Sequence, residues 1–192
     1  PGETVLDVCA APGGKTMQMA AQGGVLTALD ISASRMERVA ENLARTQLAA
    51  ELVVANILEW QDPRQFDAVL LDAPCSATGT IRRHPDLPFA KDGTGISELI
   101  ELQTQMLNAT VGRVKPGGKL VFCTCSLIPD EGEVQAENFL RRHKDFTVDT
   151  SLPQGMDPAW RTEEGGFRLR PDYWSELGGM DGFYLIRMNR RG

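Results

Sequence analysis

The chain has 192 residues, of which 42% are hydrophobic and 24% charged, and its formal net charge is −6. This length and composition are typical of one globular domain and exclude wholesale disorder, a collagen-like chain and a coiled coil. The sequence has no run of about 18 apolar residues, so we expect no membrane span. The acidic balance lacks the basic signature of many nucleic-acid binders, although local basic clusters can still bind nucleic acid.

The ends and the cysteines of the chain also constrain its class. No secretory signal precedes the first apolar segment, which starts almost at Pro1, so we expect a fragment that lacks an N-terminal part. The four cysteines are too sparse for a disulfide scaffold and lack the spacing of a zinc site. We therefore expect reduced thiols in a cytoplasmic protein, no metal site and no obligate protein partner.

Apolar segments alternate with amphipathic ones along the chain. In chain order, the first half predicts a strand at residues 4–9, a helix at 15–22, a strand at 25–30, a helix capped by Ser32 or Ser34 that runs to about Gln47, and strands at 51–55 and 66–72. The second half predicts a loop at 76–97, a helix at 98–114, a Lys-Pro-Gly-Gly turn at 115–118, a strand at 119–125, a helix at 131–143, a strand at 146–148, a long, partly ordered surface connection at 150–181 and a strand at 183–188.

This alternation predicts a single α/β domain over residues 1–192. We expect a doubly wound, Rossmann-like fold with a mostly parallel seven-stranded sheet, whose late strands form an antiparallel edge. Ligands of such sheets bind beyond the carboxyl ends of the strands.

A glycine-containing loop follows the first strand. Its residues are Cys9, Ala10, Ala11, Pro12, Gly13, Gly14 and Lys15, followed by Thr16. The small residues allow a ligand to approach the backbone, and the following helix would present free N–H groups. Asp30 ends the second strand, where an acid commonly bonds the ribose of a nucleoside cofactor.

Three ligands compete for this loop. A dinucleotide site would need Gly-x-Gly-x-x-Gly, which is absent, and a phosphate-binding P-loop would need a glycine where Cys9 stands. S-adenosylmethionine needs a glycine turn and a ribose acid but no phosphate cradle, and this interpretation fits all the parts. The structural alternative is a tight strand–helix turn with Asp30 as a helix cap. This alternative is a serious competitor for the loop alone, but it is weaker once the loop and Asp30 are considered together.

Two further strand ends carry cysteines. Cys75 follows the strand that ends at Asp72, and Cys125 ends the strand at 119–125. Neighbouring strands of a doubly wound sheet lie about 4.8 Å apart, so both ends would face the same crevice. A thiolate and an acid suit methylation of a pyrimidine at C5, in which the thiolate first adds to C6 of an unstacked base. Packing is the competing role for all four cysteines, and we assign it to Cys9 and Cys123.

Three motifs together resemble the Sun/Fmu group of RNA cytosine-5 methyltransferases, a NOL/NOP/Sun-type family. They are the loop at residues 9–16, the segment at 72–79 and Thr124-Cys125-Ser126. The stretch at 81–86 is similar to the bacterial enzymes that act on small-subunit ribosomal RNA, and the resemblance covers about residues 1–188. It implies an S-adenosylmethionine-dependent transferase acting on RNA, of which this chain is the catalytic domain.

The resemblance also implies site residues. It makes Cys125 the nucleophile and Cys75 an aid to product release, with Asp72 beside the base. The implied cofactor contacts are Cys9, Ala10, Ala11, Pro12, Gly13, Gly14, Lys15, Asp30, Asn56 and Asp72. Asn56 departs from the family, which usually has an acid there, and the N-terminal RNA-binding portion of the family is not in this chain.

A short basic stretch follows the segment that contains Cys75. Arg82, Arg83 and His84 could contact phosphates beside the target base, or they could be an ordinary charged loop. Two other functions stay open beside the methyltransferase. One is a P-loop-like nucleotide hydrolase, suggested by Gly14-Lys15-Thr16, and the other is a non-catalytic RNA-binding or assembly module, suggested by Asn56 and the acidic charge.

Overall fold

The computed structural model describes residues 1–90 and 93–192. Its strands are β1 (Thr4–Val8), β2 (Val25–Asp30), β3 (Glu51–Val54), β4 (Phe66–Asp72), β5 (Val114–Thr124), β6 (Phe146–Val148), β7 (Phe167–Leu169) and β8 (Phe183–Arg190). Its α-helices are α1 (Gly14–Ala21), α2 (Ala33–Thr46), α3 (Leu87–Ala90), α4 (Ile96–Val111) and α5 (Glu133–Arg142). Short 3-10 helices are η1 (Thr78–Thr80), η2 (Pro129–Glu131), η3 (Pro158–Trp160) and η4 (Ser175–Leu177).

One sheet runs through the described part of the chain in the order β3-β2-β1-β4-β5-β8-β6. Strands β1 to β5 pair in parallel, and β8 is antiparallel to β5. On its other side, β8 pairs with β6 near one end and with β7 near the other. The predicted doubly wound sheet of seven strands with an antiparallel edge is thus confirmed, and β7 adds a short strand to that edge.

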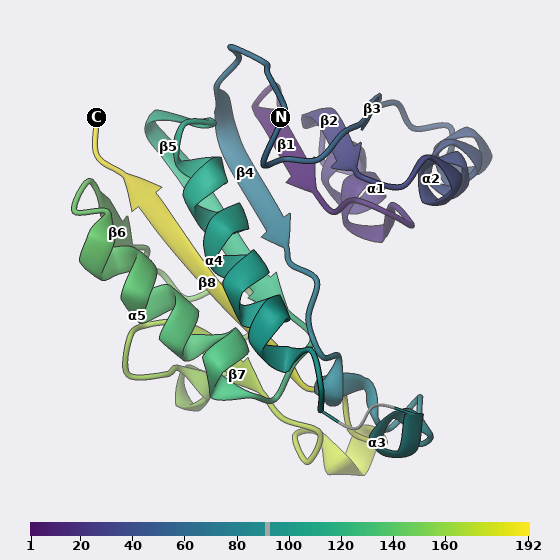
Figure 1. Ribbon diagram of the computed structural model, residues 1–192, viewed down its shortest axis with the longest axis vertical. Helices are drawn as coiled ribbons and strands as arrows, with labels where there is room; N and C mark the ends of the chain where they lie inside the picture. The colour runs from purple at the N-terminus through teal and green to yellow at the C-terminus, as the bar shows by residue number, and fades with distance from the viewer. Residues whose placement is uncertain (91–92) are drawn as a thin grey trace.

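Helices cover the sheet in two groups. Helices α4 and α5 lie side by side over β4, β5 and β8, whereas α1 and α2 pack near β2 and β3 at the other end (Figure 1). The hydroxyl of Ser32 accepts a hydrogen bond from the Arg35 amide, so Ser32, and not Ser34, caps α2. The main core forms where apolar side chains of β1, β4, β5 and β8 meet, as fully buried Leu6, Val69 and Leu120 show.

Three segments differ from the sequence-based prediction. Residues 115–118 belong to β5 instead of a turn, because the strand starts at Val114 and passes an irregularity in its pairing with β4. The predicted loop at 76–97 contains η1, α3 and the first two residues of α4, while its residues 91–92 lie outside the described residues. The connection at 150–181 is more ordered than expected, since it carries β7 and packs the buried Trp160 ring 5.1 Å from the ring of Tyr173.

Candidate active site

The carboxyl ends of three central strands meet at one edge of the sheet. Val8 of β1 is in register with Leu71 of β4, and Asp72 of β4 is in register with Cys123 of β5. The segments that leave these strands therefore start side by side. They carry the glycine loop, Cys75 and Cys125, so the predicted convergence of the three motifs is confirmed.

The glycine loop is held in a conformation that its sequence explains. Gly13 has φ = 98°, in the left-handed region, and a Cβ there would lie 3.1 Å from Cγ1 of Val39 on α2. From the same helix, Arg35 donates to the carbonyl of Ala11 at 2.7 Å and Asn42 donates to the carbonyl of Pro12 at 3.0 Å. The loop is thus fixed against α2, with its other face turned to a cavity.

That cavity has a volume of about 200 Å³. Its lining consists of Asp7, Cys9, Ala10, Ala11, Pro12, Gly14, Lys15 and Asp72. Asp7 was not recognised from the sequence, because it stands within an apolar strand. Its side chain is buried, with Oδ2 accepting from the Thr16 hydroxyl and Oδ1 having no hydrogen-bond partner among the described residues. Burial raises the pKa of Asp7 to about 6.

The unpartnered Asp7 oxygen tests whether this cavity suits the expected cofactor. A buried carboxylate without a partner is costly, and a cationic amino group from a ligand would remove that cost. Asp7 and Asp72 contribute two carboxylates to the lining against one cation, Lys15. This charge balance suits the ammonium end of S-adenosylmethionine and disfavours a nucleotide triphosphate.

Asp30 ends β2, and Asn56 follows the neighbouring strand β3. The Asp30 side chain is only 1% exposed, and its oxygens accept from the backbone N–H groups of Ala11 and Ser32. Asp30 therefore stabilises the glycine loop. A hydrogen bond to a ribose would use the remaining lone pairs of its carboxylate. The side-chain oxygen of Asn56 accepts from the Leu58 amide in a local turn.

Lys15 and Asp72 form an ion pair at the mouth of the cavity, with Nζ and Oδ2 2.7 Å apart. Burial alone would lower the pKa of Lys15, but the Asp72 carboxylate raises it above its usual value. The buried Cys123 thiol donates to the other Asp72 oxygen at 3.4 Å. Burial, followed by the Asp72 charge, raises the pKa of Cys123, and burial likewise raises the pKa of Cys9 to about 12. Neither thiol is suited to nucleophilic attack.

Cys75 and Cys125 face each other with their Sγ atoms 3.5 Å apart. Donation from the Cys75 thiol lowers the pKa of Cys125 to about 7, and a backbone N–H and Lys15 act in the same direction. The same hydrogen bond, together with burial, raises the pKa of Cys75 well above its usual range. Within this pair, Cys125 is thus the thiol whose pKa is lowered and Cys75 the one whose pKa is raised, and a lowered pKa favours the nucleophilic thiolate.

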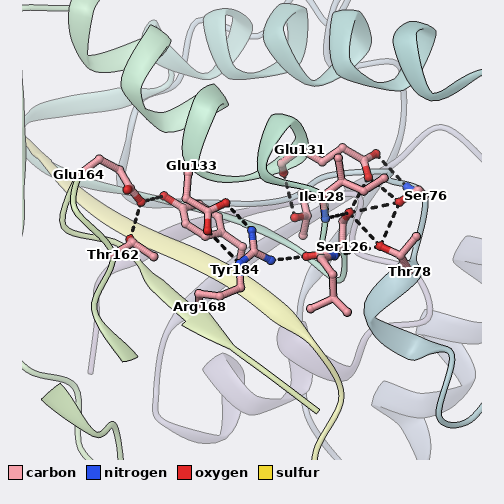
Figure 2. Close-up of polar contacts among 12 residues, drawn as sticks. Ser76, Thr78, Ser126, Ile128, Glu131, Glu133, Thr162, Glu164, Arg168 and Tyr184 are labelled. Atoms are coloured by element: carbon pink, nitrogen blue, oxygen red, sulfur yellow. Dashed lines mark hydrogen bonds and ion pairs between the residues drawn. The ribbon is translucent and has the colours of Figure 1, made fainter. Parts of the chain in front are cut away.

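A buried carboxylate, Glu131, lies between the two cysteine loops (Figure 2). It accepts hydrogen bonds from Ser76 and Ser126, the residues that directly follow Cys75 and Cys125. The sequence offered no signal for this role, because Glu131 was read as the start of a helix. In the structure it ends η2, just before α5.

The basic stretch lies further from the thiols. Arg82 and Arg83 are exposed, and both pair with Asp181, at 3.5 Å and 2.5 Å respectively. The exposed His84 closes the turn after η1 through its backbone amide. The structure does not bring these three side chains into the cavity.

Within residues 1–90 and 93–192, no group of three or more His, Cys, Asp or Glu side chains could hold a metal ion, and no helix is long and apolar enough to cross a membrane.

Comparison with known proteins places the chain in a family. The family described as 16S rRNA methyltransferase RsmB/F matches residues 1–189. Ribosomal RNA small subunit methyltransferase B of Erwinia tasmaniensis is 47% identical over 192 residues, which cover 97% of this chain and 42% of the relative. The chain thus spans less than half the length of such curated relatives.

Solved structures share the fold, and two of them serve as examples. A methyltransferase homolog protein from Pyrococcus horikoshii is 32% identical, with a TM-score of 0.77, and the match covers 99% of this chain and 62% of the other. NSun6 from Pyrococcus horikoshii with SFG is 25% identical, with a TM-score of 0.81, and the match covers 99% of this chain and 48% of the other. These likenesses agree with a Rossmann-like methyltransferase fold.

Proposed function

The chain belongs to the 16S rRNA methyltransferase RsmB/F family, and from that premise we propose that it transfers a methyl group from S-adenosylmethionine to C5 of a cytosine in small-subunit ribosomal RNA. The observation that carries the proposal is the Cys75–Cys125 contact, in which one thiol lowers the pKa of the other to about 7. Thiolate chemistry is needed because C5 of a pyrimidine is a poor nucleophile until a nucleophile adds at C6.

Each residue of the thiol site has a role in this proposal. The Cys125 thiolate forms a bond to C6 of the base, which makes C5 nucleophilic. Asp72, as an ion-paired carboxylate, accepts a hydrogen bond from the exocyclic amine of cytosine. After methylation a base removes the C5 proton, the bond between C6 and Cys125 breaks, and Cys75 assists this release from its place beside the leaving sulfur.

The cavity beside the glycine loop is the proposed cofactor site. When bound, S-adenosylmethionine supplies an electrophilic methyl group. Asp7 would hold its ammonium group, and the backbone of the loop would contact its amino-acid end. We propose that Asp30 and Asn56 flank its ribose and base, because Asp30 ends β2 and Asn56 follows β3 at the same edge of the sheet.

Ribosomal RNA is the proposed macromolecular partner. Arg82 and Arg83, which follow the segment that contains Cys75, expose about half of their side chains and would contact phosphates that flank the flipped base. Such a substrate implies a cytoplasmic location. A non-catalytic RNA-binding module would have no use for a thiol that ionises near neutral pH, and a P-loop hydrolase would have to bind a triphosphate beside two carboxylates.

Transfer of a labelled methyl group tests this function. The protein is incubated with S-adenosylmethionine labelled in its methyl group and with small-subunit ribosomal RNA, and the modified nucleoside is identified by digestion and mass spectrometry. We expect label at C5 of cytosine with the unaltered protein and none with Cys125→Ser. Label on another base, or equal labelling by Cys125→Ser, would refute the proposal.

A further inference from the structure

Glu131 is fully buried, with 0% of its surface exposed. Its carboxylate accepts four hydrogen bonds, from the Ser76 amide at 2.9 Å, the Ser76 hydroxyl at 2.5 Å, the Ser126 hydroxyl at 2.6 Å and the Gln103 amide at 3.1 Å. Removing a carboxylate from water costs several kcal/mol unless donors replace the water. The four donors offset this cost only while they keep their places, so the network resists displacement of any one of them.

The donors to Glu131 come from two distant parts of the chain. Ser76 follows Cys75 beyond β4, and Ser126 follows Cys125 beyond β5, 50 residues later. The two hydroxyls also lie 3.1 Å from each other. One carboxylate thus bridges the residues that immediately follow the two cysteines.

Arg168 holds the Cys125 loop from the other side (Figure 2). Its guanidinium donates to the Ser126 carbonyl and forms an ion pair with Glu133, to which its Nε donates at 2.9 Å. Arg168 lies on β7, the strand that the sequence did not reveal. Ser126 is therefore fixed through its hydroxyl by Glu131 and through its carbonyl by Arg168.

From this arrangement we propose that Glu131 is a positioning residue that holds the Cys75 and Cys125 loops so that the two thiols contact each other. It touches neither thiol. After the hydrogen bond to Cys125 and burial, its charge also raises the pKa of Cys75. Its hydrogen bonds to Ser76 and Ser126 position both loops. This inference deepens the proposed function, and only its expected effect on methyl transfer rests on that function. Its expected effect on the reactivity of the Cys125 thiol is measured without RNA or cofactor.

The variant Glu131→Gln changes the hydrogen bonds at this position while it keeps the volume of the side chain. Glutamine fills the same space and keeps one oxygen for the Ser76 and Gln103 amides, but it places an uncharged NH2 group where the second carboxylate oxygen accepted from the Ser76 and Ser126 hydroxyls. Both hydroxyls must then accept instead of donating, and their charge-assisted bonds to the carboxylate are lost, so we expect the weakened bridge to let the thiols move apart. Cys125 loses the donor that lowers its pKa, while Lys15 and Asp72, the charged groups that also act on it, stay in place.

The experiment measures the rate of alkylation of Cys125 by iodoacetamide against pH, with the site of alkylation identified by peptide mass spectrometry. The unaltered protein should show a midpoint near the Cys125 pKa of about 7. We expect Glu131→Gln to raise this midpoint by about one pH unit, as loss of a hydrogen bond to the charged form requires. Glu137→Gln, which makes the same charge change at an exposed position of α5, should leave it unchanged.

A second variant keeps the test decisive if Glu131→Gln does not fold. Ser126→Ala removes the group through which Glu131 acts on the Cys125 loop, and it should raise the midpoint in the same direction. Where both variants fold, the double variant should shift the midpoint less than the sum of the two, because residues of one network are not additive. Additive shifts would contradict the proposed route through Ser126.

Methyl transfer distinguishes this inference from the proposed function. If both hold, Glu131→Gln should lower kcat about tenfold or more, because the nucleophile is displaced, with little change in KM for S-adenosylmethionine. If the unaltered protein transfers no methyl group but the midpoint still shifts, the proposed function fails and the positioning role stands. An unchanged alkylation profile in folded Glu131→Gln and Ser126→Ala would overturn the positioning role.

Discussion

Among single residues, Asp7 combines near-complete burial with an oxygen that has no hydrogen-bond partner in the described part of the chain. Its pKa in the folded state, about 6, lies above the ordinary value of 3.8. The folded state therefore binds this proton more tightly than the unfolded state does. Stability from this group is fully present below about pH 4 and is lost as the pH rises through about 6.

Asp7→Asn should therefore stabilise the protein while weakening cofactor binding. The shift of about 2 pH units corresponds to a gain of about 2–3 kcal/mol in the free energy of unfolding above pH 6, and to almost none below pH 4. Asparagine also lacks the charge that we propose to hold the cofactor's ammonium. Urea unfolding at several pH values and calorimetric titration with S-adenosylmethionine check both effects.

Asp86→Asn is the control for that pair of measurements, because it removes the same charge from an exposed position. It should alter neither the free energy of unfolding nor the affinity for S-adenosylmethionine. If Asp7→Asn bound S-adenosylmethionine as tightly as the unaltered protein does, Asp7 would have no part in the cofactor site.

Cys75 is the second residue whose role is measurable in isolation. Cys75→Ala removes the donor that is the main cause of the low pKa of Cys125. We expect the pH midpoint for alkylation of Cys125 to rise from about 7 toward the ordinary value of 9.0. A midpoint that stays near 7 would mean that Lys15 or a backbone amide, and not Cys75, activates the nucleophile.

Among the elements, η1 joins the two cysteine loops to the start of β8. The Gly79 amide donates to the Cys125 carbonyl at 2.9 Å, and its carbonyl accepts from the Gly182 amide at 2.8 Å. A Cβ on Gly79 would lie 2.0 Å from the Gly182 carbonyl oxygen and 2.8 Å from the Cys125 carbonyl oxygen. Backbone cannot move aside as a flexible side chain can, so this contact leaves room only for glycine.

Gly79→Ala should consequently lower the free energy of unfolding by at least about 2 kcal/mol and separate η1 from Cys125. Gly112→Ala, at the end of α4, is the matched control, since a Cβ there meets nothing within 4 Å and the φ angle is −69°. Its effect should lie between zero and a gain of about 1 kcal/mol. Chemical denaturation of the two variants checks this contrast, and equal effects would mean that the packing around Gly79 is looser than described.

The same elements show how far sequence reasoning reached. The positions of β2, β4 and β6 were predicted to the residue, because hydrophobic runs with clear ends mark buried strands. Strand β7 was missed, since it has three residues and lies in a polar segment where pairing with β8, and not local pattern, makes it a strand. Its Arg168 therefore could not be foreseen either.

The candidate site divides in a similar way. Cys75 and Cys125 were found because motif order and strand ends place them together, whereas Glu131 was missed because its importance lies in contacts with Ser76 and Ser126 across 55 and 5 residues. Asp7 was read as part of an apolar strand, where only the three-dimensional cavity shows that one oxygen lacks a partner.

At the scale of the whole molecule, the net charge of −6 leaves RNA binding to local basic groups. Arg83 keeps 55% of its side chain exposed while it pairs with Asp181. Each phosphate contact on single-stranded RNA contributes about 0.7 to the slope of log affinity against log salt concentration. The basic stretch at Arg82 and Arg83 should therefore set a measurable part of that slope.

Arg83→Ala should weaken RNA binding and reduce the salt slope by about 0.7, as measured by filter binding over a range of salt concentrations. Arg142→Ala, an exposed arginine at the end of α5, serves as the control and should leave the slope unchanged. If both substitutions reduced the slope equally, RNA would contact the acidic protein diffusely and not through the loop that carries Arg82 and Arg83.

The covalent step is the centre of this account, and trapping it is the most direct test. Small-subunit ribosomal RNA and S-adenosylmethionine are incubated with Cys75→Ser and with Cys125→Ser, and each mixture is resolved on a denaturing gel. We expect a protein–RNA species to accumulate with Cys75→Ser, because attack proceeds but release is slow, and no such species with Cys125→Ser, because serine ionises far less readily than cysteine. An adduct that forms with Cys125→Ser and not with Cys75→Ser would exchange the two roles, and full methylation by both variants would contradict the thiol mechanism itself.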